Sequence, residues 1–412
     1  MINTITLKRY SDISVAIAVA MAIISMSPWM FWQNTYHKYL IILFLFLRLI
    51  IFNKRISQRQ LLSLYFLIPF AYFYPKFLID PISVSIEKFF AVIIILPFII
   101  LFNNEERKLF LKWTINIFSI LFFISLVAFA IKMFVYELPH TEIKNSNAYY
   151  PPFLNYYFFV IQEDWGLLTR FQGMITEPGH VGMISSLLLY VNRYSLRKWQ
   201  NFIMTISLIW SFSLAGYLLY IIGLSLFLIS KSKNPVKIFA RFIFLIIILI
   251  STIKIISTVY PNSMVYELII SRLEFDETKG IKGNNRNTGL FEQTYNQFKN
   301  TQYYYQGMPT SLYAQKFSGT ANSSYKTFVM SNGILGLLSL IFFIIGLVIA
   351  FPSRLGIGFM ILIIISFIQR PYFTWEIESI TYICLIPLDF SLQHNEENRK
   401  TSKKLLSLTK LY

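Results

Sequence analysis

The sequence is poor in cysteine, histidine and charge. Among its 412 residues there is one cysteine, Cys384, and the four histidines show no ligand spacing, so an intrachain disulfide and a cysteine metal site are both excluded. Charged residues make up only 14% of the chain, whereas soluble domains carry about 25%. A soluble chain of this length would divide into domains, each covered by polar surface. The shortage of charge therefore argues against a soluble protein.

Apolar residues dominate the rest of the chain, which is 55% hydrophobic and 18% aromatic. They form blocks separated by short basic loops, and an uncharged block of about 20 residues is long enough to cross a hydrocarbon core about 30 Å thick. This pattern predicts an all-α polytopic membrane protein with about twelve transmembrane helices. We expect the spans near residues 12–31, 36–52, 61–74, 84–102, 113–135, 178–192, 202–214, 215–229, 238–257, 327–350, 355–368 and 373–390.

The net charge of +17 is spread over loops on alternate sides of these blocks. Lys and Arg favour cytoplasmic loops, so the distribution indicates a membrane orientation and not a nucleic-acid surface. Both termini lie in the cytoplasm if the block 202–229 holds two short helices with a turn near Ser213–Gly216. The basic tail 391–412 then lies at the cytoplasmic leaflet, and we expect the chain in the lipid bilayer of a bacterial inner membrane.

Residues 1–412 are expected to form a single integral membrane domain with two sizeable periplasmic loops, 136–177 and 258–326. Long loops in compact proteins are usually either functional or disordered. Both loops contain many Tyr, Phe and Asn residues. This composition favours a folded surface that binds sugar over disorder.

The segment Arg170-Phe171-Gln172-Gly173-Met174-Ile175-Thr176-Glu177-Pro178-Gly179-His180 leads from the first of these loops into a predicted span. Pro178 suits the first turn of a helix, whose N-terminus would face outward and attract anions. Arg170 adds a planar group that can bind phosphate oxygens. Glu177 and His180 are three residues apart and can share a helix face. Alternatively, Glu177 only caps the helix and His180 is only an interfacial polar residue.

The second loop supplies two further arginines. Arg286 is the only charged residue in the stretch Gly283–Asn287 and has no acid close by in the sequence. It is therefore the better candidate to bind an anion. Arg272 has Glu274 and Asp276 close by, and it could simply pair with a local acid.

Two more helices are expected to begin at the same face. The second loop ends near Asn322 and Tyr325, where an Asn or Ser side chain would cap the following helix. Arg370 lies in the last outer turn, which would open a third helix. A diphosphate is the simplest anion that would explain several arginines and helix N-termini at one face.

Three parts of this pattern resemble the O-antigen polymerase (Wzy-type) family, within the wider group that also holds the O-antigen ligases. The first is Arg170-x-x-Gly173 followed by Glu177-Pro178-Gly179. The second is Arg286 followed by Gly307, and the third is Asn322-x-x-Tyr325 with Gly333-x-x-Gly336. The resemblance covers roughly residues 165–345. It departs from the ligases, which usually carry a histidine where Asn322 stands.

The resemblance implies a membrane glycosyltransferase of the lipid-phosphosugar class (GT-C type) that needs no cofactor, metal or nucleotide sugar. It would transfer a growing glycan from undecaprenyl diphosphate to a new lipid-linked repeat unit at the periplasmic face. Arg170 and Arg286 would bind the diphosphate, with Arg272 as a weaker third ligand. Glu177 would be the catalytic base, with His180 as the alternative. A chain-length regulator becomes a candidate partner.

Asn322, Tyr325 and Arg370 are the residues assigned to the acceptor or its sugars. Three other functions stay open. A ligase would use similar residues, although the missing histidine argues against it. A flippase for lipid-linked repeats would need charge along a central cavity, and an assembly protein would have no use for arginines at outer helix ends.

Overall fold

The computed structural model describes residues 4–24, 26, 36–51, 56–144, 152–162, 169–232, 289–317, 324–371, 373 and 379–388, with scattered positions between 234 and 281. Its helices are α1 (Thr4–Ile24), α2 (Tyr36–Ile51), α3 (Gln58–Phe73), α4 (Ile82–Lys88), α5 (Ile95–Ile100), α6 (Asn104–Phe134), α7 (Pro178–Val191), α8 (Trp199–Trp210), α9 (Leu214–Lys231), α11 (Gly289–Phe298), α12 (Tyr303–Gln306), α13 (Thr310–Phe317), α14 (Tyr325–Ala350) and α15 (Arg354–Gln369). A further apolar helix covers Ser379–Leu388.

The protein is mostly helical and has the composition of a helical membrane protein. Within the described residues, three helices (α6, α9 and α14) are long and apolar enough to cross a membrane. Shorter apolar helices cover Asp12–Ile23, Pro178–Val191, Arg354–Gln369 and Ser379–Leu388. The expected number of about twelve spans stays a prediction, as do the side of the membrane and the positions of the termini.

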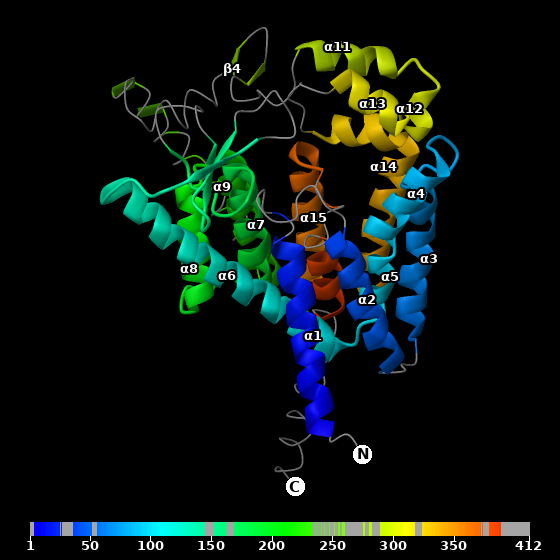
Figure 1. Cartoon of the computed structure of the whole chain (residues 1–412), viewed down its shortest axis with the longest axis horizontal. Coiled ribbons are helices and arrows are strands. Elements are labelled where there is room, and N and C mark those ends of the chain that lie inside the picture. The colour runs from blue at the N-terminus through cyan, green and yellow to red at the C-terminus, as the bar shows by residue number, and fades with distance from the viewer. Residues whose placement is uncertain are drawn as a thin grey trace.

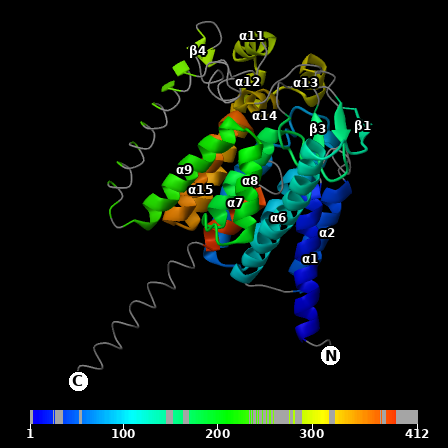
Figure 2. The ribbon, with the colours of Figure 1, turned by 90° about the vertical axis from the view of Figure 1, so that its left-hand side faces the viewer.

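The helices form a bundle with a separate group of elements at one end. Figures 1 and 2 show the short strands and α11–α13 at the end opposite the start of α1. Within the bundle, α7 packs against α8 and α9, α9 packs against α15, and α3 packs against α14. We refer to α11–α13 as the cap.

Several predicted helix boundaries are confirmed. The block 202–229 divides into α8 and α9, and Ser213 caps α9 by accepting a hydrogen bond from the Gly216 N–H group at 3.2 Å. The helix α7 begins at Pro178, which needs no N–H partner in the first turn. Ser324 caps α14. Local turn and cap chemistry therefore placed these three helix starts correctly.

The predicted span 84–102 is not one continuous helix. It consists of α4, a π-helical segment (Phe89–Ile93) and α5. Within the π-helical turn the N–H of Ile94 donates to the carbonyl of Phe89. Pro97 follows closely and has no N–H of its own to donate to the preceding turn. A π turn next to a proline is a known cause of a helix irregularity.

The contact between α7 and α9 depends on small residues. A side chain at Gly182 would overlap Ser213, and one at Gly216 would overlap the backbone of Gly182. The hydroxyl of Ser186 donates to the carbonyl of Gly216 at 2.8 Å. Close approach at glycine, together with Ser hydrogen bonds, is how helices associate in lipid, where burial of apolar area gives little driving force.

The prediction of an all-α fold needs one correction, because both loop regions contain short strands. Strands β1 (Thr141–Ile143), β2 (Phe153–Asn155) and β3 (Val160–Gln162) form an antiparallel sheet in the order β1-β2-β3, and β4 (Phe275–Asp276) pairs with β5 (Gly280–Ile281). The sheets lie within the two segments that we expected to be loops.

The cap is seated on a kink in α14. Gly333 has a φ of 74° and interrupts the helical geometry, and Gly307 at the end of α12 has a φ of 89°. Side chains at these glycines would overlap the backbone of Tyr305 and Ser331 respectively. The Met308 N–H donates to the Met330 carbonyl at 2.8 Å. The glycines noted in the sequence thus allow two backbones to touch.

Candidate functional site

Glu177 and Arg370 form an ion pair between two helix ends. Glu177 is the N-cap residue of α7, and Arg370 is the C-cap residue of α15. Arg370 Nη1 donates to Glu177 Oε2; the Arg370 side chain is 7% exposed and that of Glu177 is 32% exposed. Glu177 makes no side-chain cap bond, so the alternative that it only caps α7 is wrong. Its carboxylate is instead the partner of a buried guanidinium.

The guanidinium of Arg370 lies directly on the first turn of α7. A Cβ atom on Gly179 would overlap Arg370 Nη2 and Cζ. A cation is unfavourable at a helix N-terminus, which carries partial positive charge. The Glu177 carboxylate offsets both the charge of the Arg370 guanidinium and the partial positive charge at the start of α7. An anionic ligand at this position would face a guanidinium and the N–H groups of α7 together.

His180 completes this group from the same helix turn. It is only 3% exposed, so it is not a residue of the interfacial surface. Its Nε2 is 3.7 Å from Glu177 Oε2, and its Nδ1 is 3.0 Å from the hydroxyl oxygen of Thr176. The imidazole is thus held between a hydroxyl and the carboxylate. Such a position suits a residue that orients Glu177 or exchanges a proton with it.

Arg170 lies near the same end of α7, where it binds the turn between α8 and α9. Its Nε donates to the carbonyl of Ser211 and its Nη2 to that of Phe212, both at 3.0 Å. These bonds satisfy carbonyls at the end of α8, where no intrahelical partner exists. Arg170 therefore has a structural role at this turn, which in turn contacts α7 at Gly182.

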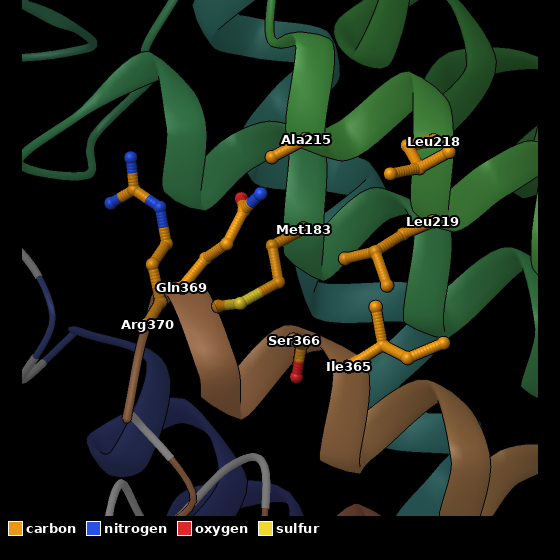
Figure 3. Close-up of a pocket in the computed structure, with 8 residues that line it drawn as sticks. All are labelled: Met183, Ala215, Leu218, Leu219, Ile365, Ser366, Gln369 and Arg370. Carbon is orange, nitrogen blue, oxygen red and sulfur yellow. The ribbon is translucent and has the colours of Figure 1, made fainter. Parts of the chain in front are cut away.

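A hollow between α7, α9 and α15 opens beside this group. Figure 3 shows Arg370 and Gln369 at one end of it, and apolar side chains together with Ser366 along the rest. The lining residues are Met183, Ala215, Leu218, Leu219, Ile365, Ser366, Gln369 and Arg370.

The other predicted site residues are not brought into this group. Tyr325 packs with the apolar residues of the cap and the start of α14, next to Tyr295, whose pKa is raised to about 12 by burial and by Tyr325. Arg272, Arg286 and Asn322 lie outside the described residues. The structure thus joins Glu177, His180 and Arg370, with Arg170 on the adjacent turn.

Two contacts in this group were not predicted from the sequence. Thr176 precedes His180 by four residues, and a hydroxyl at this spacing from a histidine is a weak signal that could have been noticed. The hollow is also partly formed by Gln369, next to Arg370. Nothing in the sequence around Gln369 indicated that α15 would line a hollow with α7 and α9.

A second group of charged residues fastens the cap to the turn between α3 and α4. Asp80 Oδ1 accepts from the Thr310 N–H at 2.7 Å, and Asp80 Oδ2 is 3.2 Å from Lys76 Nζ and 2.8 Å from Lys88 Nζ. Lys76 Nζ also donates to the Met308 carbonyl at 2.6 Å. We refer to Lys76, Asp80, Lys88 and Thr310 as the clasp. Lys88, at the end of α4, thus pairs with this acid.

The clasp shifts the ionisation of its two turn residues. Burial and then the charge of Lys88 lower the pKa of Lys76 to about 8, despite the nearby Asp80 carboxylate. Burial alone would raise the pKa of Asp80, but hydrogen bonds from Lys88 and Thr310 outweigh it and lower that pKa to about 2. Both residues lie between α3 and α4, outside the helices.

Among the described residues, no three His, Cys, Asp or Glu side chains lie close enough together to hold a metal ion. The group around Glu177 offers ion pairing and proton transfer as its chemistry. Comparisons with protein-family models, with curated proteins and with solved structures found no match to this chain.

Proposed function

We propose that this protein is a membrane polymerase that transfers a growing glycan from a polyprenyl diphosphate, undecaprenyl diphosphate in a bacterium, to a new lipid-linked repeat unit. The observation that carries the proposal is the ion pair of Glu177 with Arg370 at the N-terminus of α7, beside a hollow with an apolar wall. One location thus offers positive charge for a diphosphate and a carboxylate for an acceptor hydroxyl.

Positive charge at the start of α7 supports diphosphate binding. The helix N-terminus and the Arg370 guanidinium act in the same direction. Arg370 was assigned to the acceptor from the sequence, and its contact with α7 favours the donor diphosphate instead. Arg286 and, more weakly, Arg272 are proposed as further ligands from the second loop, with Arg170 holding the adjacent turn.

The proposed reaction uses the Glu177–Arg370 pair as a preformed couple. The donor diphosphate attracts Arg370, which weakens its contact with Glu177 and makes the carboxylate available as a base. Glu177 takes the proton of the acceptor hydroxyl as its oxygen bonds to the anomeric carbon of the donor sugar. The bond from that carbon to the diphosphate oxygen breaks, and the arginines stabilise the charge of the departing polyprenyl diphosphate. His180, 3.7 Å from Glu177, orients the base.

Deletion of the gene, followed by complementation, tests this proposal. The lipopolysaccharide of the deletion strain should carry core with a single repeat, and the wild-type gene should restore the ladder on a gel. Glu177→Gln and Arg286→Ala should fail to restore it while reaching normal protein levels in the membrane. Glu105→Gln, at an exposed pair with Lys108, is the matched control and should restore it fully.

Other outcomes identify other functions. Core without any repeat, with long glycan chains left on the lipid carrier, would contradict the polymerase and indicate a ligase. Single repeats retained on the inner leaflet would indicate a flippase. A full ladder from Glu177→Gln would disprove the base role.

A further inference from the structure

The turn that joins β2 to β3 carries two exposed aromatic residues beside α6. Tyr157 and Phe158 are 51% and 57% exposed, whereas the flanking Tyr156 and Phe159 are buried at 3% and 0%. The buried pair stacks with ring centroids 4.6 Å apart, and Phe159 also contacts Phe129 of α6. The turn is therefore fixed against α6 by one pair of rings and presents the other pair outward.

The depth of this turn can be read from α6. The stretch of α6 between Lys112 and Lys132 contains no charged residue, and its length of about 28 Å at 1.5 Å per residue matches the hydrocarbon thickness. The hydroxyl of Ser125 donates to the carbonyl of Phe158 at 2.5 Å. Ser125 precedes Lys132 by two helical turns, or about 10 Å along the axis. Measured along α6 from Lys132, the turn thus lies about 10 Å inside the uncharged stretch.

Lys132 marks the level at which this stretch of α6 meets water. Its ammonium is 3.5 Å from Glu137 Oε2 and 5.8 Å from the centroid of the Tyr156 ring. The Tyr156 hydroxyl donates to Glu137 Oε1 at 2.8 Å, so this side chain extends from the turn toward the charged level. A ring in the apolar layer with its hydroxyl at the polar boundary is typical of interfacial tyrosines.

The backbone of the turn is suited to an apolar surrounding. The N–H groups of Tyr156 and Phe158 donate to the carbonyls of Phe159 and Tyr156, at 2.9 and 2.8 Å. The Tyr157 N–H donates to the side-chain oxygen of Asn155 at 2.9 Å, and the Ser125 hydroxyl donates to the Phe158 carbonyl. These bonds satisfy polar groups of the turn, which lowers the cost of placing it away from water.

The choice of residues in the turn is informative as well. Tyr157 has a φ of 67°, a conformation that disfavours aromatic residues and that Gly or Asn adopt more easily. The turn contacts α6 at Ser125, which is buried, whereas the exposed residues Ile120, Phe123, Ile124 and Val127 lie on the other side of the helix. The two exposed rings therefore form an apolar surface separate from the exposed face of α6.

We propose that the β2–β3 turn is a membrane anchor, with Tyr157 and Phe158 inserted into the leaflet at the end of the bundle that carries the cap. The partner of this surface is the lipid bilayer itself, at the depth where headgroups meet acyl chains. This inference is independent of the proposed enzymatic function. It requires only that α6 crosses the membrane.

The anchor has a consequence for the candidate site. The N–H of Val160, at the start of β3, donates to the carbonyl of Gly173 at 2.8 Å. Gly173 belongs to the segment that runs from Arg170 to Glu177 and lies against Phe122 of α6. The turn therefore ties this segment to a fixed depth in the leaflet, so that the N-terminus of α7 is held at the level of lipid headgroups.

Spin labels at single cysteines test the anchor in the full-length protein. Cys384, which is buried, is first replaced by Ala, and Tyr157→Cys and Phe158→Cys are labelled separately and reconstituted in lipid nanodiscs. Accessibility to oxygen, which concentrates in lipid, is compared with accessibility to a water-soluble nickel chelate. Phe123→Cys on the exposed face of α6 is the lipid reference, and Glu142→Cys in the exposed part of β1 is the water reference.

We expect the ratio of oxygen to nickel accessibility at 157 and 158 to approach that at 123 and to exceed that at 142 several-fold. A ratio equal to that at 142 would overturn the proposal, because the turn would then lie in water. Low accessibility to both reagents would also overturn it, since a second copy or another protein would then cover the turn.

Discussion

The guanidinium of Arg370 lies against the α carbon of Gly179, so that no side chain fits between them. This contact joins the end of α15 to the first turn of α7 and sets the position of the ion pair with Glu177. Gly179 is thus required for space. Its backbone conformation is helical and would suit any residue.

Gly179→Ala is expected to displace Arg370 and to lower polymerisation. A methyl group at 179 would move the guanidinium by about 1 Å, and a misplacement of this size at a reacting centre can cost roughly 10²-fold in rate. The measurement is the incorporation of repeats by purified protein from synthetic polyprenyl-diphosphate-linked oligosaccharide. Gly289→Ala is the control, because nothing lies within 4 Å of a Cβ at that position. Equal rates for the two variants would remove the proposed role of the contact.

The two members of the ion pair should be strongly coupled in stability. Glu177→Gln leaves the guanidinium of Arg370 buried beside the positive end of α7, and we expect a loss of about 2 kcal/mol in the free energy of unfolding. Arg370→Gln should cost a similar amount. The double variant should cost clearly less than the sum of the two. Denaturant unfolding in detergent measures all three, and simple additivity would show that the pair contributes nothing.

Local chemistry made part of this arrangement predictable. Pro178 marks the start of α7, and Ser213 marks the division between α8 and α9, because caps and first-turn prolines act within a few residues. Arg370 was expected to lie in the last outer turn, after the predicted span 355–368. It does lie directly after α15, and there it binds Glu177, which is 193 residues away along the chain. Packing decides that contact, and no local pattern encodes it.

The clasp and the sheets were missed for related reasons. Asp80 and Thr310 are 230 residues apart, so their hydrogen bond is invisible in the sequence. The strands β1–β3 have three residues each, too few to show an alternating pattern. The apolar blocks, in contrast, predict helices well because each block carries its own signal over many residues.

Asp80→Asn is expected to loosen the cap. Asp80 has no side-chain exposure and is paired with Lys76, whose side chain is 2% exposed. Removing the only acid of the clasp leaves two neighbouring cations, and the loss of a buried partner costs about 3 kcal/mol. The expected result is faster proteolysis within residues 289–317, measured by mass spectrometry of the fragments.

The double variant Asp80→Asn, Lys76→Met should recover part of this loss, because it removes one of the two cations. The exposed pair of Lys108 and Glu105 provides the control: Glu105→Gln should change stability by no more than about 0.5 kcal/mol. If the double variant were cleaved as rapidly as Asp80→Asn alone, charge repulsion would not be the cause.

The clasp should also give the protein a specific dependence on pH. The pKa of Asp80 is lowered to about 2 from an ordinary value of 3.8, so the stability that Asp80 contributes is present above pH 4 and is lost as the pH falls toward 2. The pKa of Lys76 is lowered to about 8 from 10.5. Between pH 8 and 10.5 the unfolded chain binds the proton of Lys76 more tightly than the folded protein does. The contribution of Lys76 to stability therefore rises with pH over this range.

The Lys76 contribution can be isolated by comparing the wild type with Lys76→Met, because all other titrating groups are shared. The difference in melting temperature between the two should be constant from pH 6 to 7.5 and should shift in favour of the wild type from about pH 8 to 10. Scanning calorimetry or intrinsic fluorescence in detergent measures this shift. A difference that stays flat over the whole range would mean that Lys76 titrates as it does in the unfolded chain, and that the buried clasp does not exist in solution.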